Sequence, residues 1–265
     1  MAAASSRGFT VLIDQTEGRA DREQLVLEAV GARLIDGLIF SPLATGQREL
    51  SQRRDKTPLV LLGERSSGGL ADHVTIDNVA AAREAVLHLA RLGRRRVAAI
   101  GAQYAASMQT AHLRLVGYRE GLKQAGLAYD AALVADAPAF HRLEGARAMA
   151  RLLAGRLMPD AVFAFNDLLA LGALRACHDR GIRVPEDVAV VGFDDIEDGH
   201  YSVPSLSTIS PDKEQIARLA VELLVSQFGR GGDDARETRQ LVARHQLIVR
   251  ESSAGAVATV PLWAR

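Results

Sequence analysis

Two adjacent carboxylates, Asp194 and Asp195, end the apolar run "VVGF" at residues 190–193. Such a change from apolar to acidic residues indicates the carboxyl end of a strand. The pair could bind a metal, act as acid and base, accept hydrogen bonds from a polar ligand, or form a turn. Because neighbouring residues of a strand point to opposite faces, the two carboxylates are poorly placed to bind one ion together.

Other polar residues also follow segments that look like strands. In an open parallel α/β sheet, ligands bind at the carboxyl ends of the strands, where loops and helix N-termini converge. The polar residues at the other predicted strand ends are Asp14, Gln15, Ser41, Glu64, Arg65, Asn166 and Asp167. Each also has a simpler interpretation. Asn166 or Asp167, for example, would be a natural N-cap for the helix that follows.

Two further residues could belong to a binding site. Arg114 lies in a predicted helix, where an arginine is usually solvated, and Phe140 lies in a loop-like segment, where an aromatic more often covers the core. A carboxylate, an amide, an arginine and an aromatic together suit a polyhydroxylated ligand: the polar groups match hydroxyl pairs, and the ring covers an apolar sugar face.

Strand-length apolar runs alternate with segments of helical period along most of the chain, which predicts an α/β fold with mostly parallel sheets. The predicted strands are 9–14, 36–40, 58–63, 73–76, 96–101, 133–137, 161–165, 188–193 and 246–250. The predicted helices are 21–34, 46–55, 78–92, 112–126, 142–155, 167–180 and 212–228. Nine strands are more than one compact sheet of this length normally holds, so we expect two lobes.

Composition excludes several classes of protein. The 265 residues carry no formal net charge, so no overall field attracts nucleic acid or a membrane surface. The one cysteine, Cys177, cannot form an internal disulfide, and the N-terminus does not resemble a secretory signal, which favours a cytoplasmic location. The sequence contains no GxGxxG after a strand, phosphate loop, GxSxG or HExxH motif. We therefore expect no cofactor, no metal and no enzymatic activity.

Three long segments carry a family resemblance. They are "RVPEDVAVVGFDDIEDGHYSVPSLSTI" (183–209), "AVFAFNDLLALGALRA" (161–176) and "LRLVGYREGLKQAGL" (113–127). Together they resemble the effector-binding core of LacI/GalR-type bacterial transcriptional regulators, and the likeness extends from 7–42 to 247–252. The resemblance implies a periplasmic-binding-protein-like fold of type I, with two doubly wound parallel-sheet lobes, three crossovers and an effector in the cleft between them.

The resemblance also implies a set of ligand-binding residues. These are Arg114, Asn166 and Asp194, then Phe140 as a stacking aromatic, and more loosely Asp14 and Ser41 from the first lobe. Asp195, which should point away from Asp194 by strand alternation, is expected to be structural. Gly63 stands where some sugar-responsive members have an aspartate, so the identity of the sugar stays open.

The expected N-terminal lobe comprises residues 1–76 and 211–241, the C-terminal lobe comprises 77–210 and 242–253, and 254–265 form a tail. Compared with the family, the helix-turn-helix headpiece that enters DNA is missing, as are the first strand and helix of the core, of which "AAASS" looks like the remnant. The missing strand would lie between the strands at 9–14 and 36–40, so its loss should leave unpaired backbone and an uncovered apolar face. We therefore expect a fragment, or a gene started at an internal methionine.

The sequence thus predicts the effector-binding and dimerisation core of a repressor that senses a sugar or related metabolite. The effector would favour one lobe arrangement, and a headpiece outside this chain would transmit that preference to DNA. One alternative is a sugar-binding protein of a transport system, which is disfavoured by the lack of a signal peptide and by "VPEDVAVVGFDD". The other is an enzyme that uses Asp194 and Asp195, which is disfavoured by the lack of a partner base or nucleophile.

Overall fold

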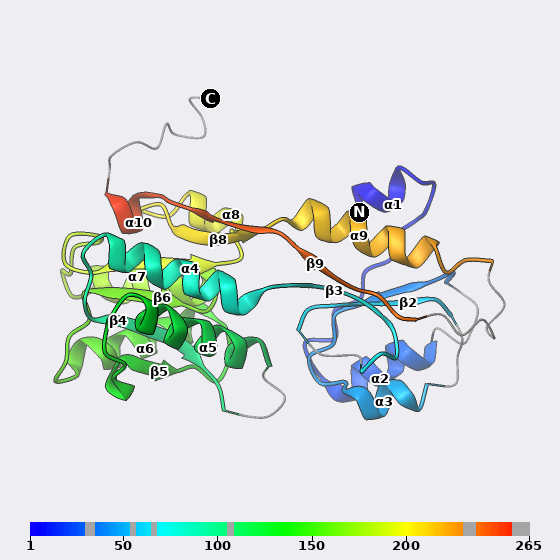
Figure 1. Ribbon diagram of the computed structural model, residues 1–265, viewed down its shortest axis with the longest axis horizontal. Coiled ribbons are helices and arrows are strands. Elements are labelled where there is room, and N and C mark those ends of the chain that lie inside the picture. The colour runs from blue at the N-terminus through cyan, green and yellow to red at the C-terminus, as the bar shows by residue number, and fades with distance from the viewer. Residues whose placement is uncertain (30–34, 54–56, 65–67, 105–108, 230–236, 256–265) are drawn as a thin grey trace. The chain divides into compact units, whose positions relative to one another are not determined.

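The computed structural model describes residues 1–29, 35–53, 57–64, 68–104, 109–229 and 237–255. The chain divides into two compact units, which are shown in Figure 1 and described separately below. Unit 1 comprises Met1–Asp77 and Asp212–Arg244, and unit 2 comprises Asn78–Pro211 and His245–Arg265. The chain therefore crosses between the units three times, as the family resemblance implied.

Unit 1 contains a four-stranded parallel sheet in the order β1-β2-β3-β9. Its strands are β1 (Leu38–Phe40), β2 (Leu59–Leu62), β3 (Asp72–Ile76) and β9 (Gln240–Ala243). Its helices are α1 (Ala2–Ser5), α2 (Ala20–Ala29), α3 (Gln47–Ser51) and α9 (Lys213–Val225).

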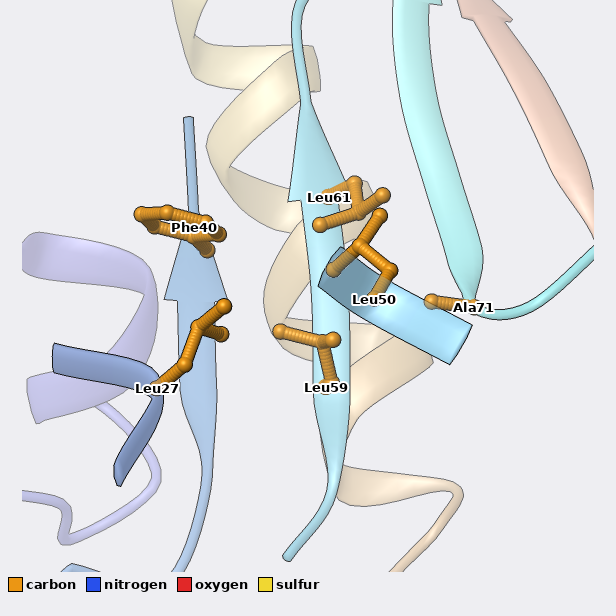
Figure 2. Close-up of a cluster of buried hydrophobic side chains, with 6 residues drawn as sticks. All are labelled: Leu27, Phe40, Leu50, Leu59, Leu61 and Ala71. Atoms are coloured by element: carbon orange, nitrogen blue, oxygen red, sulfur yellow. The ribbon is translucent and has the colours of Figure 1, made fainter. Parts of the chain in front are cut away.

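Strand β2, in the middle of the unit 1 sheet, is buried on both faces, and its sequence explains why. Leu59 and Leu61 pack with Leu27 of α2 and Leu50 of α3 in the cluster shown in Figure 2. The intervening Val60 joins a second cluster, which includes Ala220 and Leu223 of α9. Because successive side chains of a strand alternate between faces, the continuous apolar run "LVLL" supplies both clusters.

The predicted strand at 9–14 is wrong. This segment has no strand assignment, and within the described residues no strand pairs with it. Its apolar side chains are exposed, with 77% of Leu12 and 73% of Ile13 open to solvent. Phe9 packs edge-on against Phe228, with ring centroids 5.5 Å apart. The apolar pattern was that of a strand, but a strand also needs a partner for its backbone groups.

The sequence prediction differs from unit 1 at three other elements. The helix predicted at 46–55 is the shorter α3, and residues 54–56 lie outside the described residues. The helix predicted at 21–34 corresponds to α2, and residues 30–34 likewise lie outside them. Strand β9 was not predicted, because "QLVA" is short and lies between Arg239 and Arg244.

Unit 2 contains a six-stranded sheet in the order β10-β8-β7-β6-β4-β5, in which β10 is antiparallel to β8 and the other pairs are parallel. Its strands are β4 (Val97–Ala102), β5 (Val134–Asp136), β6 (Ala161–Ala164), β7 (Ala189–Phe193), β8 (Ser207–Pro211) and β10 (His245–Ile248). The sequence predicted all of these except β8, whose residues "STISP" do not form an apolar run.

The four long helices of unit 2 pack in two pairs. They are α4 (Asn78–Arg91), α5 (Gln109–Gln124), α6 (Arg142–Ala154) and α7 (Asp167–His178), and short helices lie at η2 (Ala131–Leu133), α8 (Glu197–His200) and α10 (Glu251–Ala254). Helix α4 packs against α5, and α6 against α7 (Figure 1). The connection through α5 runs from β4 to β5, whereas the connections through α6 and α7 run in the opposite direction along the sheet. Because such connections are right-handed, α5 and its partner α4 lie on one face of the sheet, and α6 and α7 lie on the other.

Glycines allow each helix pair to approach closely. A Cβ atom on Gly117 of α5 would lie 2.3 Å from the carbonyl oxygen of Val79 in α4, and one on Gly172 of α7 would lie 2.0 Å from the carbonyl oxygen of Arg142 in α6. Both distances are far below van der Waals contact. The close approach of α5 to α4 brings Arg114, one turn before Gly117, to the N-terminus of α4. In the described part of the chain, no helix is long and apolar enough to cross a membrane.

Candidate functional site

Arg114 lies at the centre of a polar cluster at the carboxyl edge of the unit 2 sheet. It is buried, and its Nε donates a hydrogen bond of 2.8 Å to Oδ1 of Asn78, the first residue of α4. Its Nη1 donates to the carbonyl oxygen of Phe165, just beyond β6. Its guanidinium also lies over the ring of Phe193, 3.5 Å from the centroid. The simpler interpretation of Arg114 as a solvated helix residue is therefore wrong.

Asp194 faces this arginine from the end of β7. One carboxylate oxygen, Oδ1, lies 3.6 Å from Nη2 of Arg114, and 39% of the Asp194 side chain is exposed. Its backbone N–H donates a 2.8 Å hydrogen bond to the carbonyl oxygen of Ile209 in β8. The cluster therefore presents a buried cation next to a carboxylate that solvent can reach.

The argument from strand alternation fails for the two aspartates. Strand β7 ends at Phe193, and Asp194 and Asp195 have φ values of +106° and +50°. Residues other than glycine seldom adopt this region of backbone conformation. The two side chains are therefore directed by an irregular turn and by the contacts that hold it, not by the pleat of a strand.

Asn166 is the N-cap that its sequence position allowed, and it also contacts the loop of Phe140. Its Oδ1 accepts a 2.9 Å hydrogen bond from the N–H of Leu169, so it is the N-cap of α7. Its Nδ2 donates a 3.2 Å hydrogen bond to the carbonyl oxygen of Phe140. This bond holds the loop of the half-buried Phe140 at the same edge of the sheet. Asn166 also directly follows Phe165, whose carbonyl oxygen accepts from Arg114.

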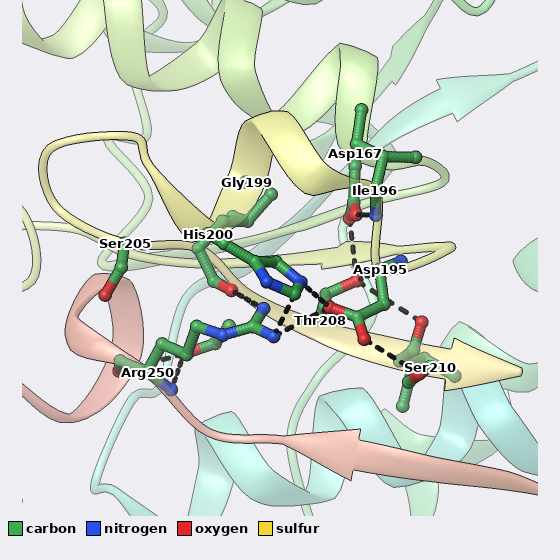
Figure 3. A network of polar contacts seen from close by, with 12 residues as sticks. Asp167, Asp195, Ile196, Gly199, His200, Ser205, Thr208, Ser210 and Arg250 are labelled. Atoms are coloured by element: carbon green, nitrogen blue, oxygen red, sulfur yellow. Dashed lines mark hydrogen bonds and ion pairs between the residues drawn. The ribbon is translucent and has the colours of Figure 1, made fainter. Parts of the chain in front are cut away.

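Asp195 belongs to a separate polar network, which is shown in Figure 3. Its Oδ1 lies 2.7 Å from Nη2 of Arg250 and 2.8 Å from Nε2 of His200, and its Oδ2 accepts a 2.9 Å hydrogen bond from Ser210. Burial acts to raise the pKa of Asp195, but the hydrogen bond and charge of Arg250, with the hydrogen bonds of His200 and Ser210, hold that pKa below its ordinary value. Sequence reasoning had not identified the three partners: His200 lies in α8, Ser210 lies in β8, and Arg250 precedes α10.

Asp167 lies beneath the same turn. It is buried, its Oδ1 accepts a 2.7 Å hydrogen bond from the hydroxyl of Thr208, and its Oδ2 accepts a 2.9 Å bond from the N–H of Ile196. Burial raises its pKa to about 7. A Cβ atom on Gly192 would lie 2.2 Å from Oδ1 of Asp167, so the carboxylate occupies space that only a glycine leaves open.

The remaining predicted residues, Asp14 and Ser41, belong to unit 1. Asp14 is exposed at the end of the segment that was wrongly predicted as a strand. Ser41 is exposed directly after β1, and a Cβ atom on Gly63 would lie 3.7 Å from its Oγ. The structure thus brings Arg114, Phe140, Asn166 and Asp194 together within unit 2.

The polar groups of this edge can both donate and accept hydrogen bonds. An arginine and an amide beside a carboxylate match vicinal hydroxyl groups, each of which donates one hydrogen bond and accepts others. Among the described residues, no group of three or more histidine, cysteine, aspartate or glutamate side chains is arranged to hold a metal ion.

Comparisons with known proteins agree with this fold. Residues 86–253 match the model of the periplasmic binding protein-like domain, so the fold is of that class. The ribose operon repressor of Escherichia coli is 33% identical over 224 residues, which are 84% of this chain and 67% of that protein. A LacI-family transcriptional regulator from Sanguibacter keddieii is 46% identical, with a TM-score of 0.85 over 96% of this chain and 91% of that one. The transcriptional regulator CelR in complex with cellobiose is 32% identical, with a TM-score of 0.80 over 95% of this chain and 76% of that one.

The chain belongs to the LacI family of transcriptional regulators and corresponds to their effector-binding domain. The chain spans about two thirds of the length of the ribose operon repressor. These homologues are transcriptional regulators and not enzymes, and they favour a regulator over the alternative of a transport protein.

Proposed function

We propose that this chain is the sugar-sensing core of a repressor, and that the sugar binds at the edge of unit 2 formed by Arg114, Phe140, Asn166 and Asp194. The observation that carries the proposal is the partly exposed carboxylate of Asp194 beside the buried guanidinium of Arg114. Buried charges are costly unless they are paired and hydrogen-bonded, and Arg114 has such partners in Asn78 and Phe165. A rigid cation next to an accessible carboxylate is a suitable arrangement for recognising hydroxyl groups.

The relatives support a sugar as the effector class. CelR is described in complex with cellobiose, and the ribose operon repressor is named for a ribose operon. We infer that Asp14 and Ser41 contribute from unit 1, following the family resemblance. Binding would act as a two-state switch, because an effector shifts an equilibrium only by its difference in affinity for the two states.

The remaining parts of the proposal concern partners and location. We infer a cytoplasmic homodimer that acts on DNA through a helix-turn-helix headpiece outside these 265 residues. We also propose binding without catalysis, because Asp195 is engaged with Arg250, His200 and Ser210 and is therefore poorly placed to act as a second acid or base beside Asp194.

A thermal-shift screen tests the proposal directly. The protein is heated with ribose, cellobiose, other mono- and disaccharides, and purines as a different ligand class. A ligand at about 100 times its dissociation constant adds roughly 2.7 kcal/mol of stability, which appears as a clear rise in Tm. Isothermal titration calorimetry then measures the dissociation constant of each sugar that raises the Tm.

Two variants give the screen its specificity. Asp194→Ala should remove the sugar-dependent rise in Tm while the unliganded protein still unfolds cooperatively. Asp179→Ala is the matched control, because this aspartate pairs with Arg175 at the opposite end of α7 from Asn166. A full sugar response in Asp194→Ala would exclude Asp194 from the site, and a response to purines alone would overturn the assignment of a sugar.

A further inference from the structure

The turn after β7 is the part of the proposed site that most needs support from its surroundings. Asp194 and Asp195 are consecutive residues with side chains, and both have positive φ. Such a conformation is unfavourable for L-residues other than glycine and persists only where surrounding contacts hold it. The contacts around Asp195 are therefore candidates for controlling where Asp194 points.

The first set of contacts fixes the side chain of Asp195. Arg250, His200 and Ser210 lie within 2.9 Å of its two carboxylate oxygens (Figure 3). The side chains of Arg250 and Asp195 are only 11% and 17% exposed, so solvent screens their attraction weakly.

Arg250 is itself fixed to the start of β8. Its Nη1 donates a 2.7 Å hydrogen bond to the carbonyl oxygen of Leu206, and its backbone N–H donates a 2.7 Å bond to the hydroxyl of Ser207. Arg250 precedes α10 and follows β10, the strand through which the chain re-enters unit 2. The network therefore ties the C-terminal segment of unit 2 to the turn after β7.

A second set of contacts holds the backbone of the turn. The N–H of Asp194 donates to the carbonyl oxygen of Ile209, and the N–H of Ile196 donates to the carboxylate of Asp167. Between them, the N–H of Asp195 lies 3.4 Å from the hydroxyl of Thr208. Three successive backbone N–H groups are thus directed at fixed acceptors, while the side chain of Asp195 is anchored on Arg250.

We propose that Asp195 and Arg250 are positioning residues that hold Asp194 toward Arg114 and the effector. This inference rests on the proposed function, because Asp194 is the residue assigned to the ligand. Asp195 would contact no ligand atom. Its anchored carboxylate would keep the backbone of the turn in the left-handed region, and that backbone sets the direction of the Asp194 side chain.

The first test needs no ligand. Amide hydrogen exchange, followed by NMR, compares the N–H groups of Asp194 and Ile196 in the wild type and in Asp195→Ala. We expect exchange at both amides to become at least tenfold faster. The amide of Phe165, which donates to the carbonyl oxygen of Ile100, should keep its rate. Unchanged exchange at Asp194 and Ile196 in the folded variant would overturn the proposal.

Two more variants make this test robust. Asp136, on β5, forms an exposed ion pair with Arg151 of α6. Asp136→Ala removes this carboxylate and should leave both turn amides unchanged. Ser210→Ala removes one hydrogen bond from Asp195 and should accelerate the same amides by a smaller factor, so it decides the question if Asp195→Ala does not fold. Turn amides that respond equally to Asp136→Ala would also overturn the proposal.

The second test measures binding of the sugar that raises the Tm of the wild type most. Asp195→Ala should raise its dissociation constant at least tenfold at a temperature where the variant is fully folded. Asp195→Asn, which keeps an oxygen for Arg250, should recover most of the affinity. A residue that only stabilised the fold would lower the denaturant midpoint without changing the dissociation constant. If no sugar binds the wild type, the proposed function fails, whereas the exchange experiment still decides whether Asp195 positions Asp194.

Discussion

Nη2 of Arg114 lies 3.6 Å from Oδ1 of Asp194, although the two residues belong to α5 and to the end of β7. The guanidinium is fixed by Asn78, Phe165 and the ring of Phe193, so it reaches the carboxylate as a rigid group. Rigidity at a binding site reduces the entropy lost on binding. The first prediction below tests this relationship.

Arg114→Met should destabilise unit 2 by about 3–6 kcal/mol, because it removes two hydrogen bonds from a charged donor that contribute about 1.5–3 kcal/mol each. Arg114→Lys should lose less stability but still lose sugar binding, since an ammonium cannot reproduce the planar fork of donors. Urea unfolding and calorimetric titration measure the two effects. Arg175→Met, in an exposed pair with Asp179, should stay within about 0.5 kcal/mol of the wild type.

Asn166 allows capping to be separated from ligand recognition. Asn166→Ala should lower the unfolding free energy by about 1 kcal/mol, because it removes the N-cap of α7. Asn166→Asp keeps an oxygen for the N–H of Leu169 but loses the N–H donor to Phe140, so it should keep its stability and bind sugar more weakly. Equal sugar affinity in Asn166→Asp and the wild type would leave Asn166 with the capping role alone.

Asp167 should make unit 2 less stable as pH rises. Burial raises its pKa in the folded protein to about 7, above its ordinary value of 3.8, so the folded state binds a proton that the unfolded state releases. The stability that this proton contributes is therefore fully present below about pH 4 and is lost as pH rises through about 7. At 1.36 kcal/mol per pKa unit, the loss in unfolding free energy has an upper bound of ~4 kcal/mol.

Asp167→Asn isolates this contribution from that of other titrating groups. Its amide can accept from the N–H of Ile196 and donate to the hydroxyl of Thr208, and it does not titrate. Urea unfolding at pH 5 and pH 8 should show the variant gaining stability relative to the wild type as pH rises. Parallel pH dependences for the two proteins would contradict the prediction.

Gly192→Ala should destabilise unit 2 by about 1–3 kcal/mol, because the new Cβ atom would overlap Oδ1 of Asp167 at 2.2 Å. Adding Asp167→Ala removes that oxygen and should make the double variant more stable than the sum of the two single effects. Strict additivity in a double-mutant cycle of unfolding free energies would show that the two residues do not compete for this space.

Much of unit 2 was predictable because its sequence patterns are local. Apolar runs such as "AVFA" at β6 and helices of regular period gave five of its six strands and all four long helices within a few residues. Strand β8 was missed because "STISP" is polar, yet its hydroxyl groups serve Asp167 and Asp195. Its strand character follows from pairing with β7 and β10, which no local pattern shows.

The segment at 9–14 illustrates the opposite error. "FTVLID" has the composition of a strand, but strand formation also requires backbone partners, and none of the described residues provides them. Local preference is therefore insufficient where the neighbouring strand is not determined by the same stretch of sequence.

The sequence by itself determined the α/β alternation, the two sheets, the resemblance to LacI/GalR-type regulators, and the polar residues at the strand ends. Only the tertiary structure decided which partner each of those polar residues contacts. It placed Arg114 beside Asp194, paired Asp195 with Arg250, and buried Asp167 under the turn. These contacts form because helices and strands far apart in the chain lie together at one edge of the sheet. Ion-pair and hydrogen-bond partners depend on such long-range contacts, whereas the period of apolar residues can be seen in the local sequence.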